Sequence, residues 1–459
     1  MLRRYALAFK LFLVLASLFF YGRLGVQYLA LLLVVALLNW GTVRLISLCR
    51  REACCKWLVA GDVTLHILLL AFYKYAEPLF LLLSSLLRAG SPVQHWLAES
   101  GMGEVVLPAG LSFYSFMGLS LVIDYYRDRS QPVRSFLDVL AYVSFFPTIM
   151  AGPIMRGRQF FPQLQVTQAD ASCFNEGICY ILSGMFKKIV LATYLSRNLV
   201  DPLFEMPDTY TSAAALVGIY AYTIQIFCDF SGYTDMAIGI GRLMGFRLPQ
   251  NFESPYRSLN LQEFWRRWHI TLSLWLRDYL YIPLGGSRRG NRYFNLIVTM
   301  VIGGLWHGSG LNFLIWGFFH GMGLAVVHAF HGIREKLQVS ERLQGRGWSI
   351  LGKVAAWLLT FHSVAALWVF FRAGSFEEAC AVFNSVWSGS GDSGFEPRIL
   401  LIIVLVLVLQ WAGPGCFARF AGGMARLPWP LQAVVAGLLG GTILAMGPEG
   451  MLPFIYFDF

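Results

Sequence analysis

One histidine stands among glycines between two apolar segments, where a titratable group is costly. His307 lies in the segment Gly-Gly-Leu-Trp-His-Gly-Ser-Gly at positions 303–310, and the apolar run before it, from Tyr293 to Trp306, has about 14 residues. At ~1.5 Å per residue, a helix of that length reaches roughly 20 Å into a hydrocarbon core about 30 Å thick. Ionisable residues inside a membrane are rare and mark functional sites. We therefore expect His307 to lie within the membrane at a functional site.

The imidazole of His307 is suited to general base catalysis. A neutral imidazole accepts the proton of a hydroxyl group while the hydroxyl oxygen attacks a carbonyl carbon, as in acyl transfer. The neighbouring glycines allow a close approach of a ligand or a sharp change of chain direction. We assign the adjacent Trp306 to the same site as a substrate contact. The alternative is a core histidine that is hydrogen-bonded to a neighbouring helix.

A second histidine lies in the largest basic block of the chain, residues 242–292. The centre of this block, 261–282, has polar residues at three- and four-residue steps, which predicts an amphipathic helix at the membrane interface or dipping into a cavity. Those polar residues are Gln262, Arg266, His269, Ser273 and Arg277. His269 therefore has two interpretations, a direct chemical role or an ordinary place on the polar face.

The arginines of this block suit anionic ligands. They bind either the phosphates of a nucleotide-like carrier such as coenzyme A or anionic lipid head groups. The arginines in question are Arg266, Arg267, Arg277, Arg288 and Arg289. We include Arg266, Ser273, Arg277 and the adjacent Asp278 among the candidate substrate-binding residues.

Two carboxylates interrupt another apolar run. Asp229, Tyr233 and Asp235 lie in the segment 225–235, and we include all three among the candidate substrate-binding residues. Carboxylates at membrane depth face protein or a water-filled cavity and pair with a cation. A purely structural polar network is the alternative, and the same choice applies to Lys187 and Lys188 in a separate apolar run.

The composition requires a polytopic membrane protein. Of 459 residues, 57% are hydrophobic and only 14% are charged, with a mean hydropathy of +0.58. Soluble domains carry about 25% charged residues. The net charge of +10 comes from short basic clusters between apolar runs, so it indicates membrane topology and no nucleic-acid partner.

The apolar runs predict an all-α protein with about ten to twelve transmembrane or re-entrant helices. They fall near 6–21, 24–47, 57–87, 105–126, 137–152, 174–200, 212–241, 293–306, 311–330, 354–371, 399–413 and 431–447. Basic clusters place the N-terminus and the loop 334–353 in the cytoplasm. The run 57–87 forms either one kinked span around Pro78 or two spans. We expect one integral-membrane domain, residues 1–459, with its motif core at about 105–330.

The sequence predicts neither a metal site nor a disulfide framework. His328 and His331 have a helical spacing without a third ligand, and no histidine-glutamate zinc motif occurs. The eight cysteines show no metal-ligand spacing, and most lie in or beside apolar runs.

Together these segments resemble the membrane-bound O-acyltransferases, in particular their alginate O-acetyltransferase branch. The resemblance covers roughly residues 10–372. Its motifs are Phe-Tyr-Lys-Tyr-Ala at 72–76, Leu-Pro-Ala-Gly-Leu-Ser-Phe-Tyr at 107–114, Ala-Gly-Pro-Ile at 151–154, Asp-Phe-Ser-Gly-Tyr-Thr-Asp-Met-Ala at 229–237, Glu-Phe-Trp-Arg-Arg-Trp-His-Ile at 263–270, Trp-Leu-Arg-Asp-Tyr-Leu-Tyr at 275–281 and Gly-Leu-Trp-His-Gly at 304–308.

The resemblance implies that His307 is the catalytic residue and that His269 is a second functional position. It also implies a ring of helices around a central tunnel in the membrane, where a cytoplasmic acyl donor meets an acceptor from the opposite side. The donor would be acetyl-CoA, as a substrate and not as a permanently bound cofactor.

The expected function is transfer of acetyl from acetyl-CoA, across a bacterial inner membrane, toward an exported polysaccharide such as alginate or cellulose. A periplasmic acetyltransferase of the SGNH type, or a polysaccharide synthase complex, would be the partner. The alternatives are O-acetylation of peptidoglycan, transfer of D-alanine to teichoic acid and, from another class, a secondary transporter. A transporter of this kind is expected to contain paired repeats, and we find none.

Overall fold

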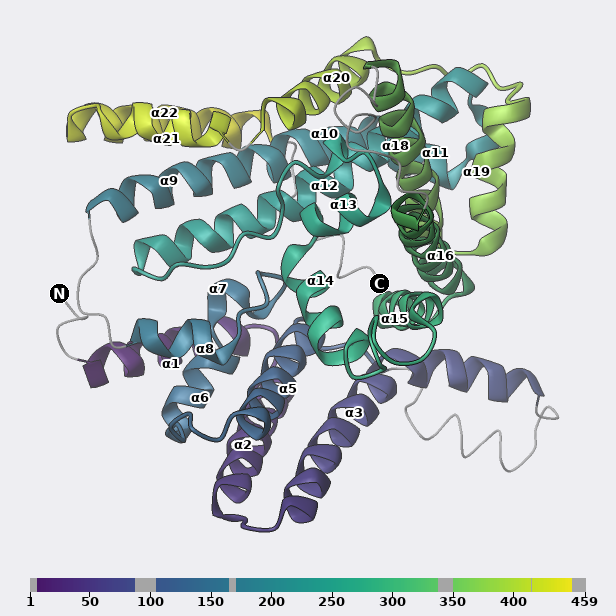
Figure 1. The fold of residues 1–459 in the computed structure, drawn as a ribbon. Helices are drawn as coiled ribbons and strands as arrows, with labels where there is room; N and C mark the ends of the chain where they lie inside the picture. Colours follow the sequence, from purple (N-terminus) through teal and green to yellow (C-terminus); the bar gives the residue numbers. More distant parts are fainter. Residues whose placement is uncertain (1–5, 87–104, 165–170, 337–349, 414, 448–459) are drawn as a thin grey trace. The chain divides into compact units, whose positions relative to one another are not determined.

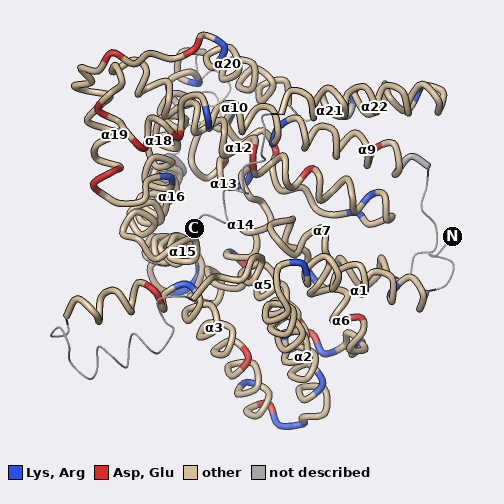
Figure 2. The backbone as a smooth tube through the Cα atoms, turned by 180° about the vertical axis from the view of Figure 1, so that it is seen from behind, with Lys and Arg blue, Asp and Glu red and all other residues tan. Residues whose placement is uncertain are grey.

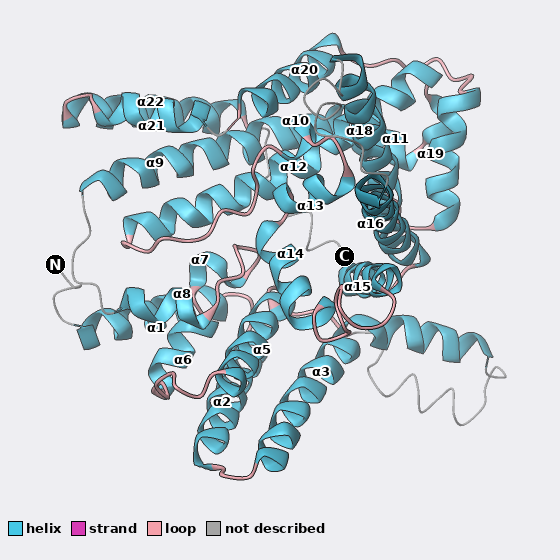
Figure 3. Ribbon diagram, viewed as in Figure 1, coloured by secondary structure: helices cyan, strands magenta, loops and turns pink. Residues whose placement is uncertain are grey.

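The computed structural model describes residues 6–86, 105–164, 171–336, 350–413 and 415–447. Across these ranges the chain is almost entirely helical, and Figure 3 shows helices joined by short loops. In the same ranges no strand forms, and β-pairing is limited to isolated bridges between 210–211 and 390–393. The all-α prediction is confirmed.

The contacts divide the chain into two compact units, each described here by itself. The first unit comprises Met1–Asp170 and Met244–Pro249. Its helices are α1 (Ala6–Gly22), α2 (Val26–Leu48), α3 (Glu52–Leu86), α5 (Leu111–Arg127), α6 (Phe136–Val143), α7 (Phe146–Ile149) and α8 (Gly157–Phe160), followed by a 3-10 turn at Phe161–Leu164. Within this unit α2, α3 and α5 pack side by side (Figure 1).

A buried polar cluster joins α2 to α3 in the first unit. The Asn39 amide lies 3.4 Å from the Asp62 carboxylate and 3.3 Å from the His66 imidazole, and the Thr42 hydroxyl donates to the same carboxylate at 3.2 Å. All four side chains are buried. Polar groups in an apolar helix pair fix the register, because each one needs its partner.

The second unit comprises Ala171–Leu243 and Gln250–Phe459. Its first part contains α9 (Ala171–Met185), a π-helix (Phe186–Ala192), α10 (Thr193–Leu195), a second π-helix (Ser196–Val200), α11 (Asp201–Glu205), a 3-10 turn (Pro207–Thr209) and α12 (Ser212–Leu243). It continues with a 3-10 turn (Pro255–Arg257), α13 (Leu261–Arg267), α14 (Ile270–Leu276), a third π-helix (Arg277–Tyr281), α15 (Arg292–His307) and α16 (Leu311–Lys336). It ends with α18 (Ile350–Arg372), α19 (Phe376–Ser388), α20 (Pro397–Ala412), α21 (Gly415–Ala425) and α22 (Trp429–Met446).

Glycines bring the backbones of α9 and α12 into contact, and α21 and α22 cover α9 (Figure 1). A Cβ on Gly184 would lie 2.4 Å from the carbonyl oxygen of Gly232, and a Cβ on Gly232 would lie 2.7 Å from that of Gly184. Small residues allow this close approach between apolar helices. The contact sets the π-helix after α9 beside the carboxylates of α12.

Seven described helices are long and apolar enough to cross a membrane. They span Val26–Leu48, Glu52–Leu86, Cys173–Glu205, Ser212–Leu243, Leu311–Ile333, Ile350–Arg372 and Trp429–Met446, with shorter apolar helices at Leu7–Gly22 and Pro397–Ala412. The described part of the run 57–87, up to Leu86, lies in one helix that continues through Pro78. The protein is therefore a multi-pass membrane protein, while the predicted total of ten to twelve segments stays a prediction.

Charged residues gather at helix ends and on short connections. Figure 2 shows Lys and Arg at the turn between α2 and α3, and Asp and Glu on α19. The basic residues at this turn are Arg50 and Arg51, and Lys56 follows near the start of α3. Most of the basic loop 334–353, residues 337–349, lies outside the described residues.

Candidate active site

His307 is the last residue of α15, as the glycine-rich sequence around it predicts. The helix has 16 residues, so at ~1.5 Å per residue it is about 24 Å long, shorter than a hydrocarbon core of about 30 Å. The chain leaves the helix at Gly308, whose backbone is extended. The His307 side chain is 5% exposed. A titratable group thus sits buried at the end of a helix that is too short to span the membrane alone.

Close packing of α15 on α16 fixes the position of His307. A Cβ on Gly304 would lie 2.2 Å from the carbonyl oxygen of Phe313, and a Cβ on Gly317 would lie 2.4 Å from that of Met300. No larger side chain fits at either position without separating the two helices. The glycine before the histidine is therefore needed for helix contact, in addition to any role in ligand access.

Aromatic rings surround the His307 imidazole. The ring centroid of Trp306 lies 4.6 Å from that of His307, that of Phe371 on α18 lies at 4.9 Å, and that of Trp316 on α16 lies at 5.2 Å. Trp316 and Phe371 are almost fully buried. Large rigid rings on several sides hold the imidazole in one orientation and displace water, which strengthens electrostatic interactions there.

A further buried histidine, His320, belongs to the same aromatic cluster and was missed from the sequence. It lies on α16 with its ring centroid 4.8 Å from that of Trp316. The indole N–H of Trp265 on α13 donates to its Nδ1 at 3.2 Å. A signal was present, because Trp316 and His320 have an i, i+4 helical spacing within a glycine-containing apolar run. The glycines of that run, Gly317 and Gly321, have the four-residue spacing of helix-packing residues, which by itself does not indicate a functional site.

His269 does not lie on the polar face of a continuous helix, so the prediction of one amphipathic helix over 261–282 is wrong. Trp268 is extended and His269 has φ 42° and ψ 55°, a left-handed conformation that separates α13 from α14. His269 is 1% exposed. After α14 the chain continues as a π-helix over Arg277–Tyr281. The three- and four-residue spacing of polar residues survives a two-residue break, which is why the pattern alone suggested one helix.

Asn251 holds the left-handed turn at His269. Its Oδ1 lies 3.1 Å from His269 Nδ1 and accepts the Thr271 backbone N–H at 3.1 Å and the Thr271 hydroxyl at 2.9 Å. The Asn251 backbone carbonyl accepts the Ile270 N–H at 2.9 Å. Asn251, 18 residues before His269, therefore supplies the hydrogen-bond acceptors that a continuous helix would otherwise have provided.

Burial favours the neutral form of the His269 imidazole. Burial lowers its pKa to about 3, because the charged ring would lose its hydration. Asn251 Oδ1 is an acceptor, so the His269 proton is on Nδ1 and the lone pair is on Nε2. The ring of Phe230, next to Asp229 in the chain, packs edge-on against the imidazole at 4.7 Å.

A run of ring contacts links the two histidines within the second unit. Trp316, which contacts His307, lies 6.0 Å from Trp368, and Trp368 lies 4.8 Å from Trp268, the neighbour of His269. The structure thus places both predicted histidines in one aromatic core, on elements that are separated in the sequence.

The predicted carboxylates are paired with lysines. Asp229 forms an ion pair with Lys188, and Asp235 forms one with Lys187 at 2.5 Å. Both lysines come from the π-helix that follows α9, where the extra residue per turn changes which side chains face α12. Tyr233 lies half-buried on α12 between the two aspartates. A cationic partner for each carboxylate was expected, although not these two lysines, and the pairs fit the structural alternative as well as the functional one.

The remaining predicted residues lie along α13, α14 and the third π-helix. Arg266 is exposed and lines a pocket of about 440 Å³. The Ser273 hydroxyl donates to the Trp268 carbonyl at 3.3 Å, and Arg277 Nε donates to the Asp278 carboxylate at 2.7 Å. Of the predicted substrate contacts, Trp306 packs its ring against the His307 imidazole, with centroids 4.6 Å apart.

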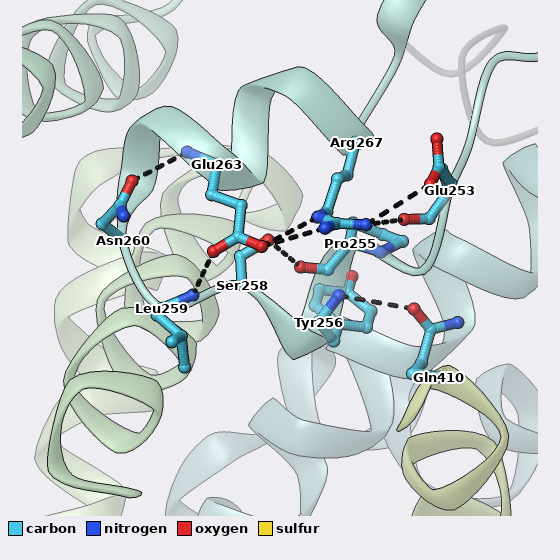
Figure 4. Close-up of polar contacts among 9 residues, drawn as sticks. All are labelled: Glu253, Pro255, Tyr256, Ser258, Leu259, Asn260, Glu263, Arg267 and Gln410. Carbon is cyan, nitrogen blue, oxygen red and sulfur yellow. Dashed lines mark hydrogen bonds and ion pairs between the residues drawn. The ribbon is translucent and has the colours of Figure 1, made fainter. Parts of the chain in front are cut away.

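Arg267, next to Arg266, is engaged by glutamates. It lies 3.0 Å from Glu263 and 3.6 Å from Glu253, and Figure 4 shows its guanidinium between the two carboxylates. Asn260 caps α13 by accepting the Glu263 N–H at 2.8 Å. The charge of Arg267 is therefore balanced by Glu253 and Glu263. Across the described part of the chain, no group of three or more His, Cys, Asp and Glu side chains is arranged to hold a metal ion.

Comparison with known proteins identifies the family. Residues 124–367, which include both histidines, match the family model of the membrane-bound O-acyltransferases. A Pseudomonas putida protein named "Probable alginate O-acetylase AlgI" is 34% identical over 98% of this chain and 94% of its own length.

Two further relatives carry other names. A Helicobacter pylori "Peptidoglycan O-acetyltransferase" is 35% identical over 84% of this chain and 75% of its own length. A Bacillus subtilis "Teichoic acid D-alanyltransferase" is 29% identical over 56% of this chain and 66% of its own length. The family match, the relatives that cover most of this chain and the helical membrane fold agree with the motifs that contain His269 and His307. The chain belongs to the membrane-bound O-acyltransferase family and is an O-acyltransferase.

Proposed function

We propose that the protein transfers an acetyl group from cytoplasmic acetyl-CoA toward a hydroxyl group of an exported polysaccharide, with His307 as the general base. The names of the relatives that cover most of the chain support acetyl as the transferred group. The observation that carries the proposal is the position of His307, buried among aromatic rings at the end of a short helix. A proton acceptor at that place can serve an acceptor hydroxyl and a thioester that enter from opposite sides.

In this reaction His307 takes the proton of the acceptor hydroxyl as its oxygen attacks the thioester carbonyl carbon. A carbon–oxygen bond forms, the carbon–sulfur bond breaks with its electron pair on sulfur, and the imidazolium returns the proton to the thiolate. The products are an acetyl ester and free coenzyme A. General base catalysis of this kind contributes about 10²–10⁴-fold in rate.

The surroundings of His307 suit this role. The carbonyl end of α15 carries the negative end of the helix dipole, which stabilises positive charge on a side chain there by about 0.3–1 kcal/mol. Trp306, Trp316 and Phe371 fix the ring, so little reorientation is needed when the proton moves.

We propose that His269 orients the donor or the acceptor rather than supplying the base. Its Nδ1–H is committed to Asn251, which fixes the ring and its tautomer. The basic block 242–292 attracts the donor's phosphates from the cytoplasm, and Arg266 is the residue of α13 that we propose contacts them. The remaining proposed substrate contacts are Ser273, Arg277 and Asp278, together with Asp229, Tyr233 and Asp235 on α12.

The proposed location is a bacterial inner membrane. The acetyl group would reach the polysaccharide either directly or through a periplasmic SGNH-type acetyltransferase, with the polysaccharide synthase complex nearby. Alginate is the acceptor that the name of the Pseudomonas relative suggests. Peptidoglycan is the second candidate because of the Helicobacter relative, and D-alanyl transfer to teichoic acid is the third because of the Bacillus relative.

The test is to supply acetyl-CoA, labelled in its acetyl group, to inverted membrane vesicles that contain the protein. We expect label in polysaccharide or in a periplasmic protein, and none in vesicles lacking the protein. A parallel reaction supplies labelled D-alanine as the thioester of its carrier protein. Transfer from the D-alanyl thioester alone would contradict acetyl transfer and assign the chain to teichoic acid modification.

A further inference from the structure

A second pocket in the second unit, called the groove below, combines an apolar wall with positively charged side chains. It has a volume of about 520 Å³ and opens to the outside of the unit. Its walls come from the segment before α13, from α13, from the first turns of α18 and from the end of α20. The lining residues are Arg257, Leu259, Glu263, Arg267, Ile350, Lys353, Val354, Trp357 and Trp411.

Two of the cations in this groove are not neutralised by the carboxylates that the structure describes. Arg267 and Glu263 form an ion pair at 3.0 Å, and the second oxygen of Glu263 accepts the Leu259 N–H at 2.9 Å, so these two charges cancel. Arg257 and Lys353 have no ion pair within the described ranges. The groove therefore carries two net positive charges.

The wall of the groove includes large apolar side chains that are exposed on the surface of the protein. Ile350 is 83% exposed, Val354 43% and Trp411 52%, although all three are large and apolar. Ile350 and Val354 lie at the start of α18, a helix of 23 residues that is long and apolar enough to cross a membrane. Apolar side chains exposed on such a helix contact acyl chains. Tryptophan and lysine near the end of a span are typical of the membrane–water interface.

The groove has a rigid floor. The indole N–H of Trp357 donates to the Tyr256 carbonyl at 2.7 Å. Gln410 on α20 accepts the Tyr256 N–H at 3.4 Å (Figure 4). The Tyr256 ring packs on Trp268, the neighbour of His269, with centroids 6.0 Å apart. The residue beside Arg257 thus connects the groove to the segment that carries the second histidine.

We propose that this groove binds one anionic phospholipid of the cytoplasmic leaflet. Arg257 and Lys353 hold the phosphate, and an acyl chain lies along Ile350, Val354 and Trp411. Basic pockets between transmembrane helices on the cytoplasmic side are suited to anionic head groups. The charge and the lipid-facing wall together favour a phospholipid over the water-soluble acyl donor. Binding stabilises the segment 255–269, and the site is separate from the acyl-transfer chemistry at His307.

The test is native mass spectrometry and lipid titration of the purified protein in phosphatidylcholine nanodiscs, with and without phosphatidylglycerol. We expect one tightly bound phosphatidylglycerol in the wild type. In Arg257→Gln/Lys353→Gln its affinity falls on the order of 30-fold, since a cation at an anionic lipid surface contributes about 1 kcal/mol and 1.4 kcal/mol is tenfold. The charge-conserving variant Arg257→Lys/Lys353→Arg retains binding and shows that the site tolerates substitution.

The matched control is Arg50→Gln/Arg51→Gln, which removes two exposed cations from the turn between α2 and α3 and leaves the bound lipid in place. Equal binding of phosphatidylcholine, or an equal loss in the control variant, would overturn the proposal. Displacement of the lipid by acetyl-CoA would also overturn it and assign the groove to the acyl donor. None of these outcomes depends on whether acetyl transfer is observed.

Discussion

The left-handed backbone at His269 predicts that glycine is more stable than alanine at this position, whereas a continuous helix would predict the opposite order. Alanine and glycine both remove the imidazole and its hydrogen bond to Asn251, so the difference between them reports on the backbone alone. In the left-handed region an L-residue other than glycine is strained by about 1–2 kcal/mol. Glycine avoids this strain but adds about 0.4–1 kcal/mol of unfolded-state entropy. With φ at 42° and ψ at 55°, His269→Gly should therefore be more stable than His269→Ala by up to about 1.6 kcal/mol.

In a continuous helix over 261–282 the order would be reversed. Alanine would then be favoured over glycine by about 1 kcal/mol, because glycine is a poor helix former. The assay is the thermal unfolding midpoint of both purified variants in the same detergent, together with their acetyl transfer. A higher midpoint for His269→Ala would refute the left-handed turn. If the glycine variant folds at least as well as the alanine variant and both lose activity, the loss belongs to the imidazole.

Two further substitutions test the packing around the site. Gly304→Ala should destabilise the protein by about 1–3 kcal/mol, because its Cβ would lie 2.2 Å from the Phe313 carbonyl oxygen. The control Gly303→Ala should be tolerated, since the nearest neighbour of its Cβ lies at 3.4 Å. Equal melting midpoints of the two variants would contradict this packing. Lys188→Met should cost about 3–5 kcal/mol, because it leaves the Asp229 carboxylate, 10% exposed, without its lysine. The double variant with Asp229→Leu should recover part of that loss, and additive losses in chemical denaturation would argue against the pair.

The sequence predicted the helical segments well because apolar length is a local property. The runs 24–47, 212–241 and 431–447 correspond closely to α2, α12 and α22. The end of α15 at His307 was equally predictable, since glycines there end the apolar run. These features need only the composition of neighbouring residues and the thickness of a membrane.

The break at His269 was not predictable in the same way. It depends on hydrogen bonds that the Asn251 oxygens accept, 18 residues earlier in the chain, and no local pattern indicates that partner. The π-helix after α9 is also invisible to periodicity, although it is what turns Lys187 and Lys188 toward α12. His320 was missed because its neighbours suggested helix packing alone.

The most direct test of the central claim is acetyl transfer by the purified protein in proteoliposomes, with His307→Ala compared with the wild type. The label is carried by acetyl-CoA and followed into the acceptor. The control is His362→Ala, an exposed histidine of α18 that hydrogen-bonds Tyr220. We predict that His307→Ala, at a normal melting midpoint, transfers label about 10²–10⁴-fold more slowly, while the control matches the wild type. A folded His307→Ala protein that transfers acetyl at the wild-type rate would contradict the assignment of His307 as the general base.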